Sequence, residues 1–204
     1  MIQSLEFIRN LSWAELVELW KSKEHEVWEG YIAQQGLKDW NDYRFGPMGT
    51  ITRYGYDEFN LSDQEWKEYH MPDVHLIAPR LYTGPFRSWT KFNTSNPDAS
   101  QAFIQLVQHP ELRSNENIQW AVEQLKEGNP SFGIGLHEPE RDVISLLDGH
   151  HTFSAINILV DEGFKGPYPK VPLYLMQVPE EQKVFFYDLI EGRTQPIPFG
   201  TPAR

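Results

Sequence analysis

The segment from residue 132 to residue 162 constrains the fold more than any other part of the chain. Two apolar runs, residues 132–136 and 143–147, flank the polar turn Glu-Pro-Glu-Arg-Asp. The second run ends in Asp148-Gly149-His150-His151, and a helix that is apolar nearly all round is predicted over residues 152–162. Such a helix must be buried against a sheet. The segment therefore predicts an α/β (α+β) architecture in which a helix starts at the end of a strand.

The remaining sequence predicts three regions. Helices are expected after the capping-box residue Ser12 and over residues 24–35, 61–66, 96–107, 114–127 and 180–191. Strands are expected over residues 74–77 and 171–178. The chain then divides into a helical, aromatic-rich N-terminal extension (1–72), an α/β domain (73–178) and a C-terminal helix with a proline-rich tail (179–204).

Composition excludes several kinds of chemistry. The chain has no cysteine, which rules out disulfides, thiolate metal sites and cysteine nucleophiles. Its net charge of −11 repels phosphate backbones, so we do not expect broad nucleic-acid binding. No signal-peptide pattern and no membrane-spanning apolar run is found, which favours a cytoplasmic location without a membrane partner. The oligomeric state is not predicted.

The Asp-Gly-His-His motif has the chemistry of an anion site. The first amides of a helix lack internal partners and carry partial positive charge. Gly149 lets a ligand approach the backbone closely, and protonated His150 or His151 would add charge-assisted hydrogen bonds. The motif therefore predicts a site suited to phosphate. Asp148 is a candidate helix cap, magnesium ligand or hydroxyl acceptor.

Two other interpretations of the motif are open. In the first, Asp148 is only a helix cap, Gly149 is a turn residue, and the two histidines are packed or solvated. In the second, His137 joins from the neighbouring strand to form a metal site, since His150 and His151 point about 100° apart on a helix and do not converge on one ion.

The order strand, polar turn, strand, Asp-Gly-His-His, helix, strand resembles the ParB/sulfiredoxin-like fold. It is most similar to ParB-like domains whose signature is Asp-Gly-His-His, usually followed by Arg. The resemblance covers about residues 73–178, with residues 77–81 matching the first strand and its proline-containing exit. It implies that the signature helix binds a nucleotide. Members of this fold include CTP-binding partition proteins, sulfiredoxin, a free-serine kinase and proteins called nucleases.

This chain departs from the family pattern in informative ways. Sulfiredoxin chemistry needs a cysteine, and the signature arginine is replaced by Thr152. Too few residues follow Val178 for a DNA-binding helix-turn-helix. The acid that serves the serine kinase as its base is missing after the first strand, where Arg80 and Arg87 stand instead. These two cations are candidates for a second phosphate or an acidic substrate, or are ordinary surface residues.

The resemblance and the motif together predict a nucleotide-binding enzyme, either a phosphotransferase acting on a small molecule or a nucleotide hydrolase. Mg²⁺ with ATP, ADP or CTP is the expected cofactor, and Asp148 its metal ligand. The expected phosphate contacts are Gly149, His150, His151, Thr152, Arg80 and Arg87; the candidate bases are Glu138, Glu140 and His137.

Two alternative functions remain. The first is a metal-dependent nuclease that uses Asp148, His137 and one motif histidine. The second is a non-catalytic interaction protein that kept the fold.

Overall fold

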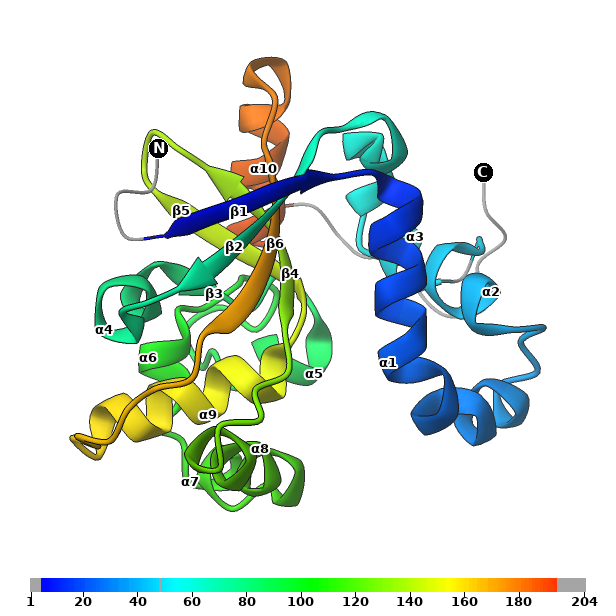
Figure 1. The fold of residues 1–204 in the computed structure, drawn as a ribbon. Helices are drawn as coiled ribbons and strands as arrows, with labels where there is room; N and C mark the ends of the chain where they lie inside the picture. Colours follow the sequence, from blue (N-terminus) through cyan, green and yellow to red (C-terminus); the bar gives the residue numbers. More distant parts are fainter. Residues whose placement is uncertain (1–4, 48, 194–204) are drawn as a thin grey trace. The chain divides into compact units, whose positions relative to one another are not determined.

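The strand–turn–strand–helix segment is present in the computed structural model, which describes residues 5–47 and 49–193 and, within these, all side chains except those of residues 25–28. Strands β4 (Gly133–Glu138) and β5 (Val143–Asp148) pair antiparallel, and Gly149 connects β5 to helix α9 (His150–Asp161) (Figure 1). The prediction of a helix beginning at the end of a buried strand is confirmed, and α9 starts two residues earlier than expected.

Six strands form one mixed sheet within the described residues. Their order is β1 (Glu6–Leu11), β2 (Trp66–Met71), β6 (Val171–Gln177), β4, β5 and β3 (Leu81–Tyr82). β2 runs antiparallel to β6, β4 runs parallel to β6, and β3 runs parallel to β5. The fold class predicted from sequence, α/β with a mixed sheet and flanking helices, is therefore confirmed at this level.

Helices cover both faces of the sheet. The helices of this unit are α4 (Val74–Ile77), α5 (Arg87–Thr90), α6 (Phe103–Leu106), α7 (Pro110–Arg113), α8 (Glu116–Lys126), α9 and α10 (Lys183–Ile190), with the 3-10 turns η3 (Ala78–Arg80) and η4 (Glu180–Gln182). Gly133 faces α9, since a Cβ added there would lie 2.3 Å from the Phe153 ring. Glu138, five residues along the same strand, faces the opposite way and bonds Tyr187 of α10. α9 and α10 therefore lie on opposite faces.

Helix α9 is the central buried element of this unit. Every residue from Thr152 to Leu159 is buried, and α8 and α6 pack along the helix. Gly133 is required where α9 meets the sheet, because any larger side chain would push the Phe153 ring away. The start of α9 is thus held in a fixed place at the end of β5.

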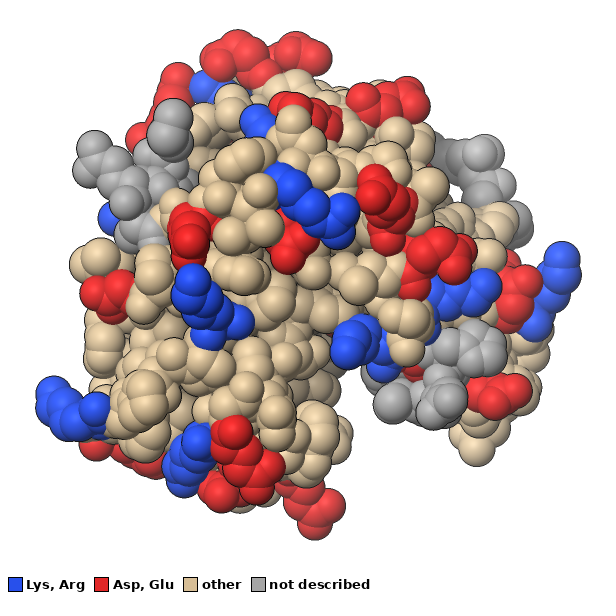
Figure 2. All heavy atoms as spheres, in the orientation of Figure 1, with Lys and Arg blue, Asp and Glu red and all other residues tan. Residues whose placement is uncertain are grey.

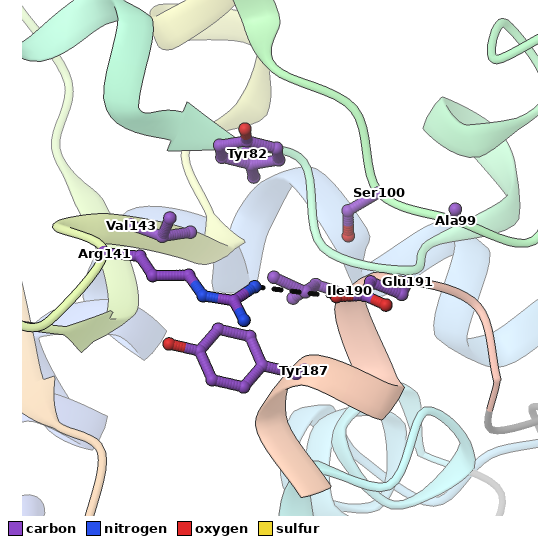
Figure 3. A pocket seen from close by; sticks show the side chains of 8 residues that line it. All are labelled: Tyr82, Ala99, Ser100, Arg141, Val143, Tyr187, Ile190 and Glu191. Carbon is purple, nitrogen blue, oxygen red and sulfur yellow. Dashed lines mark ion pairs between the residues drawn. The ribbon is translucent and has the colours of Figure 1, made fainter. Parts of the chain in front are cut away.

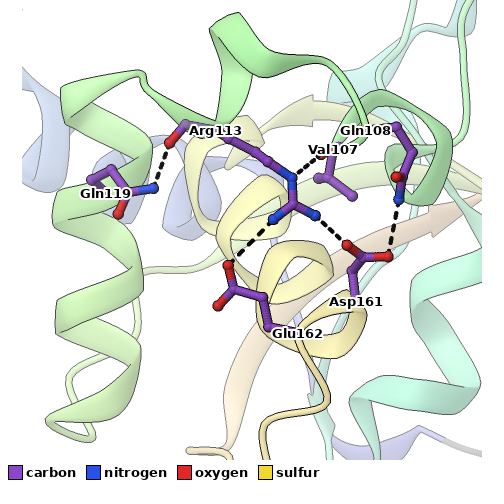
Figure 4. Close-up of polar contacts among 6 residues, drawn as sticks. All are labelled: Val107, Gln108, Arg113, Gln119, Asp161 and Glu162. Carbon is purple, nitrogen blue, oxygen red and sulfur yellow. Dashed lines mark hydrogen bonds and ion pairs between the residues drawn. The ribbon is translucent and has the colours of Figure 1, made fainter.

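A polar cluster fastens the other end of α9 (Figure 4). Asp161 and Glu162 lie at the helix C-terminus, where the helix dipole disfavours negative charge. The Arg113 guanidinium pairs with both carboxylates and donates to the carbonyl of Val107 at 2.7 Å. This single arginine therefore compensates the acids and ties α9 to the loop before α7.

Residues 11–65 form a second compact unit. The predicted capping box is confirmed, since Ser12 accepts from the Glu15 amide and the Glu15 carboxylate accepts from the Ser12 amide. The two helices expected here are one continuous helix, α1 (Trp13–Gln34). It is followed by α2 (Trp40–Phe45), α3 (Thr50–Arg53), η1 (Tyr56–Phe59) and η2 (Leu61–Asp63). Edge-to-face contacts of Trp20 with Trp40 and Phe45 form its core.

Several predicted elements differ from the structure. Residues 74–77 are the helix α4, not a strand, because the Asp73 carboxylate caps its start. The helix expected over residues 96–107 is reduced to α6, because the Asn96 side chain accepts from the Asp98 amide and forms a local turn instead. The helix expected over residues 61–66 is η2 followed by the start of β2.

The domain boundary predicted after residue 72 also differs from the observed division. Strands β1 and β2 belong to the sheet, so the first compact unit contains the described residues 5–10 together with residues 66–193. The expected C-terminal helix is α10, and the proline-rich tail lies outside the described residues.

The surface carries no dominant basic region among the residues that are described on the face drawn in Figure 2, where acidic side chains are scattered among Lys and Arg. This agrees with the net charge of −11. Of the helices that the structure describes, none is both long and apolar enough to cross a membrane.

Candidate functional site

The residues predicted to form one site fall into two groups at opposite ends of β5. The helix-start group consists of Asp148, Gly149, His150, His151 and Thr152. The turn group consists of Arg80, His137, Glu138 and Asp142. His137 pairs with Ile144, and Glu138 pairs with Val143, four and five residues before Asp148. At 3.3 Å per residue, roughly 10 to 13 Å separates His137 from Asp148 along the ladder.

This separation corrects the predicted assignment of bases. His137 and Glu138 lie too far along the ladder to take a proton from a group held at the start of α9. Glu140, in the turn beyond Glu138, is excluded for the same reason. The proposed metal site that combined His137 with Asp148 is not formed either.

The backbone at Gly149 fixes the start of α9. Its φ of 93° is in the left-handed region, and a Cβ there would lie 2.5 Å from the Phe132 carbonyl oxygen. Gly149 is itself the N-cap, and no side chain caps the helix. Asp148, half-buried at the end of β5, is therefore not the cap that one interpretation assigned to it.

His150 is a packed residue. Its ring is 8% exposed, stacks on Trp89 with centroids 5.1 Å apart, and meets the edge of Phe86 at 5.2 Å. The Nε2 atom lies 2.6 Å from the Thr83 carbonyl oxygen. A carbonyl only accepts, so Nε2 carries the proton and donates it to the backbone. The predicted phosphate contact from this nitrogen is therefore already used within the protein.

His151 has a different environment. His151 is exposed to solvent, but its ring also makes an edge-to-face contact with Trp89, with the ring centroids 5.4 Å apart. Partial burial of the imidazole lowers the pKa of His151, and the nearby charge of Asp148 opposes this shift. The imidazole is therefore mostly neutral at pH 7 and able to accept a proton. Thr152, one residue on, is buried.

The two predicted arginines differ in position. Arg87 is the exposed first residue of α5, two residues before Trp89, which contacts both imidazoles. Arg80 belongs to the turn group, where its Nη1 lies 2.5 Å from Asp142 Oδ2. Arg87 is thus the cation on the element that packs against the helix-start group, and Arg80 is part of an ion pair elsewhere.

Asp142 connects two members of the turn group. Besides Arg80, it receives a hydrogen bond from His137 Nε2 at 3.2 Å. Burial lowers the pKa of His137, against the opposing effect of the Asp142 hydrogen bond and charge. The neutral His137 ring therefore donates to an ionised carboxylate, and its position between sheet and turn is structural.

The shift at His137 has a consequence for stability. Because folding lowers its pKa below the ordinary value of 6.5, the unfolded chain binds more protons just below that pH. Stability should fall as the pH drops through 6.5, by at most about 1.4 kcal/mol per pH unit for this group. Urea denaturation between neutral and mildly acidic pH tests this. His137→Gln should flatten the slope of stability against pH; a slope equal to that of the wild-type protein would contradict the assignment.

Glu138 is the most completely buried acid of the turn group. Its side chain is inaccessible and accepts from the amides of Glu140 and Arg141, both at 2.9 Å, and from the Tyr187 hydroxyl. Burial alone would raise the pKa of Glu138, but these hydrogen bonds and the Lys183 charge lower it. Burial and the Glu138 carboxylate raise the pKa of Tyr187 to about 12. Glu138 is thus an ionised structural anchor.

Sequence reasoning missed the residues that organise both groups. His150 contacts Thr83 and Trp89 of α5, which lie more than sixty residues earlier in the chain. No local sequence pattern predicts these contacts. The register of the β4–β5 hairpin was readable, because residues equally distant from its turn pair with each other. That symmetry places His137 opposite Ile144 and away from Asp148.

Within the described part of the chain, no group of three or more His, Asp or Glu side chains could hold a metal ion. The residues therefore do not fit a metal centre held by protein ligands alone. A single carboxylate such as Asp148 still fits Mg²⁺ that is bound chiefly through phosphates and water.

Comparison with known proteins leaves the family open. No family model matches the chain, and neither curated proteins nor solved structures give a significant match. The function must therefore be argued from the geometry of the helix-start group.

Proposed function

We propose that the protein binds a nucleotide at the start of α9 and transfers or hydrolyses its terminal phosphate. The observation that carries this proposal is the helix start itself. Gly149 is an N-cap without a side-chain cap, the Asp148 carboxylate precedes it, and the exposed His151 imidazole stands two residues after it. Helix amides in this arrangement bind phosphate. The order β4, turn, β5, motif, α9, β6 also supports our proposal that residues 73–178 are a ParB/sulfiredoxin-like domain.

The roles of the residues follow from their environments. The amides at the start of α9 hold phosphate oxygens, and Arg87 of α5 is the candidate for neutralising charge on them. Mg²⁺, which would be held by Asp148, supplies further charge neutralisation when bound. His150 does not touch the ligand through Nε2; it fixes the helix start by its bond to Thr83.

His151 is the proposed base. Its lowered pKa leaves a neutral ring that accepts the proton of an attacking water or hydroxyl. The attacking oxygen forms a bond to the terminal phosphorus as the bond from that phosphorus to the bridging oxygen breaks. The leaving group is the nucleotide that is one phosphate shorter, and its former bridging oxygen keeps the electron pair of the broken bond. The proton remains on the His151 imidazole until the product departs. This role replaces the expected bases of the turn group.

The nuclease alternative is weaker than the nucleotide hypothesis. It needs His137 beside Asp148, and the strand register separates them. The non-catalytic alternative has one observation in its favour, which is that His150, His137, Glu138 and Arg80 all bond within the protein. Binding without turnover would decide for it.

Isothermal titration calorimetry with ATP, ADP and CTP, with and without Mg²⁺, tests the proposal. At least one nucleotide should bind. His151→Gln should weaken its binding about tenfold, because it removes the hydrogen bond that the single N–H of the neutral imidazole donates to an ionised phosphate oxygen. Asp148→Asn should remove most of the gain that Mg²⁺ gives and leave metal-free binding intact.

The control is His75→Gln, which removes an exposed imidazole from α4 and should leave the affinity unchanged. Phosphorus NMR of the bound nucleotide then reports turnover, which His151→Gln should abolish. No binding of any nucleotide by the wild-type protein would refute the proposal.

A further inference from the structure

A cavity of about 320 Å³ lies on the other face of the sheet, away from the helix-start group (Figure 3). β3, the start of β5 and α10 contribute its walls, through Tyr82, Val143, Tyr187 and Ile190. Its volume is at the lower end of the range for small-molecule sites. The walls are apolar and aromatic, so they favour a ligand with an apolar body.

The cavity is preformed by backbone contacts. The Ser100 amide donates to the Ile190 carbonyl at 2.8 Å, and the Asn96 side chain donates to the Glu191 carbonyl at 3.3 Å. These bonds hold the loop before α6 against the end of α10. A ligand would therefore meet walls that are already in place, which reduces the ordering cost of binding.

One buried polar atom in the wall has no partner. Ser100, a residue that is 9% exposed, lines the cavity (Figure 3), and its Oγ has almost no solvent-accessible surface and makes no hydrogen bond within the described residues. Leaving a buried hydroxyl unpaired costs about 1–3 kcal/mol. Rotation of the Ser100 side chain toward the cavity that it lines would let a ligand polar group pair with this hydroxyl.

One cation faces the same cavity. The Arg141 guanidinium lies 4.0 Å above the centre of the Tyr187 ring, and its Nη1 is 3.8 Å from Glu191 Oε1. The Arg141 side chain is 63% exposed, and so long an ion pair at an exposed position contributes little. A ligand carboxylate that approaches Arg141 in bidentate geometry would displace Glu191.

From these contacts we propose that the cavity binds a small carboxylate with an apolar or aromatic body. The carboxylate pairs with Arg141, the body packs on Tyr82, Val143 and Ile190, and the Ser100 hydroxyl makes a second polar contact. This site is independent of the proposed nucleotide site, because the cavity lies on the opposite face of the sheet from α9.

Saturation-transfer NMR and calorimetry with phenylacetate, benzoate and isovalerate test the proposal on the full chain. At least one carboxylate should bind, and its neutral amide should bind more weakly by about tenfold or more. Arg141→Gln should weaken binding by a similar factor, Ser100→Ala by about fivefold. Glu191→Gln should strengthen it, because the competing carboxylate is removed.

Lys126→Gln is the matched control, since it removes one exposed positive charge from α8. It should leave the affinity for the carboxylate unchanged. Melting curves of each variant exclude loss of folding as the cause. Failure of all three carboxylates to bind would overturn the proposal. Three further results would overturn it as well. They are equal affinity for the acid and its amide, tighter binding of phenethylammonium than of phenylacetate, and undiminished carboxylate binding by Arg141→Gln.

Discussion

Gly149→Ala is expected to lower the free energy of unfolding by about 4 kcal/mol, because two penalties combine at this position. A non-glycine residue is strained at a φ of 93°. The new Cβ would also lie 2.5 Å from the Phe132 carbonyl oxygen and 2.9 Å from the Gly133 Cα, both backbone atoms that cannot rotate away. Urea denaturation followed by circular dichroism measures the loss, and the melting temperature should fall by about 10 °C.

Gly163→Ala, just beyond the other end of α9, is the matched control. Its φ of 68° is also left-handed, but an added Cβ there meets no atom within 4 Å. Only the backbone strain applies, so the loss should be about 1 kcal/mol. The difference between the two variants measures how tightly the helix start is pressed onto β4. If both variants lost the same stability, the close approach described here would be wrong.

Glu138→Ala is expected to cost about 3 kcal/mol, close to 1 kcal/mol for each of the three donors it leaves unpaired. These donors are the amides of Glu140 and Arg141 and the Tyr187 hydroxyl, and the Glu138 side chain is fully buried. Glu138→Gln should lose about half as much, because an amide oxygen still accepts from some of them. The same denaturation measurement applies.

The pH dependence distinguishes an ionised Glu138 from a neutral one. Because folding lowers its pKa, its contribution is fully present above the ordinary value of 4.5 and is lost as the pH falls through the lower folded value. Glu138→Gln should remove this acid-dependent part. Glu140→Ala, a neighbouring exposed acid that also contacts Lys183, should change stability by less than about 0.5 kcal/mol. A Glu140 effect as large as that of Glu138 would contradict the assignment.

The parts of the fold that sequence predicted are those with local signals. Ser12 and Glu15 form a capping box whose spacing determines its structure. Short apolar runs around a polar turn, followed by a glycine and a longer apolar segment, predict β4, β5 and α9 from their lengths and order. Strand β1 was missed because five of its six residues are exposed, and β2 because most of its side chains are only half-buried.

The candidate site could be predicted only in part, because its backbone has a local sequence signal and its side-chain contacts do not. The motif indicates a helix start, and the structure has one, with Gly149 in the required conformation. The side-chain roles depend on contacts between distant segments, such as the Thr83 carbonyl that binds His150 and the Asp142 carboxylate that binds Arg80. Neither contact leaves a periodic or spaced pattern in the sequence.

Capture of phosphate at the start of α9 can be observed residue by residue in an NMR titration. Nitrogen-15-labelled protein would be titrated with the Mg²⁺ complexes of ATP, ADP and CTP. We expect saturable shifts that are largest for the amides of Gly149, His151 and Thr152 and that need more nucleotide to saturate in His151→Gln. Shifts confined to the cavity around Ser100 and Arg141, or no saturable shift at any amide, would contradict it.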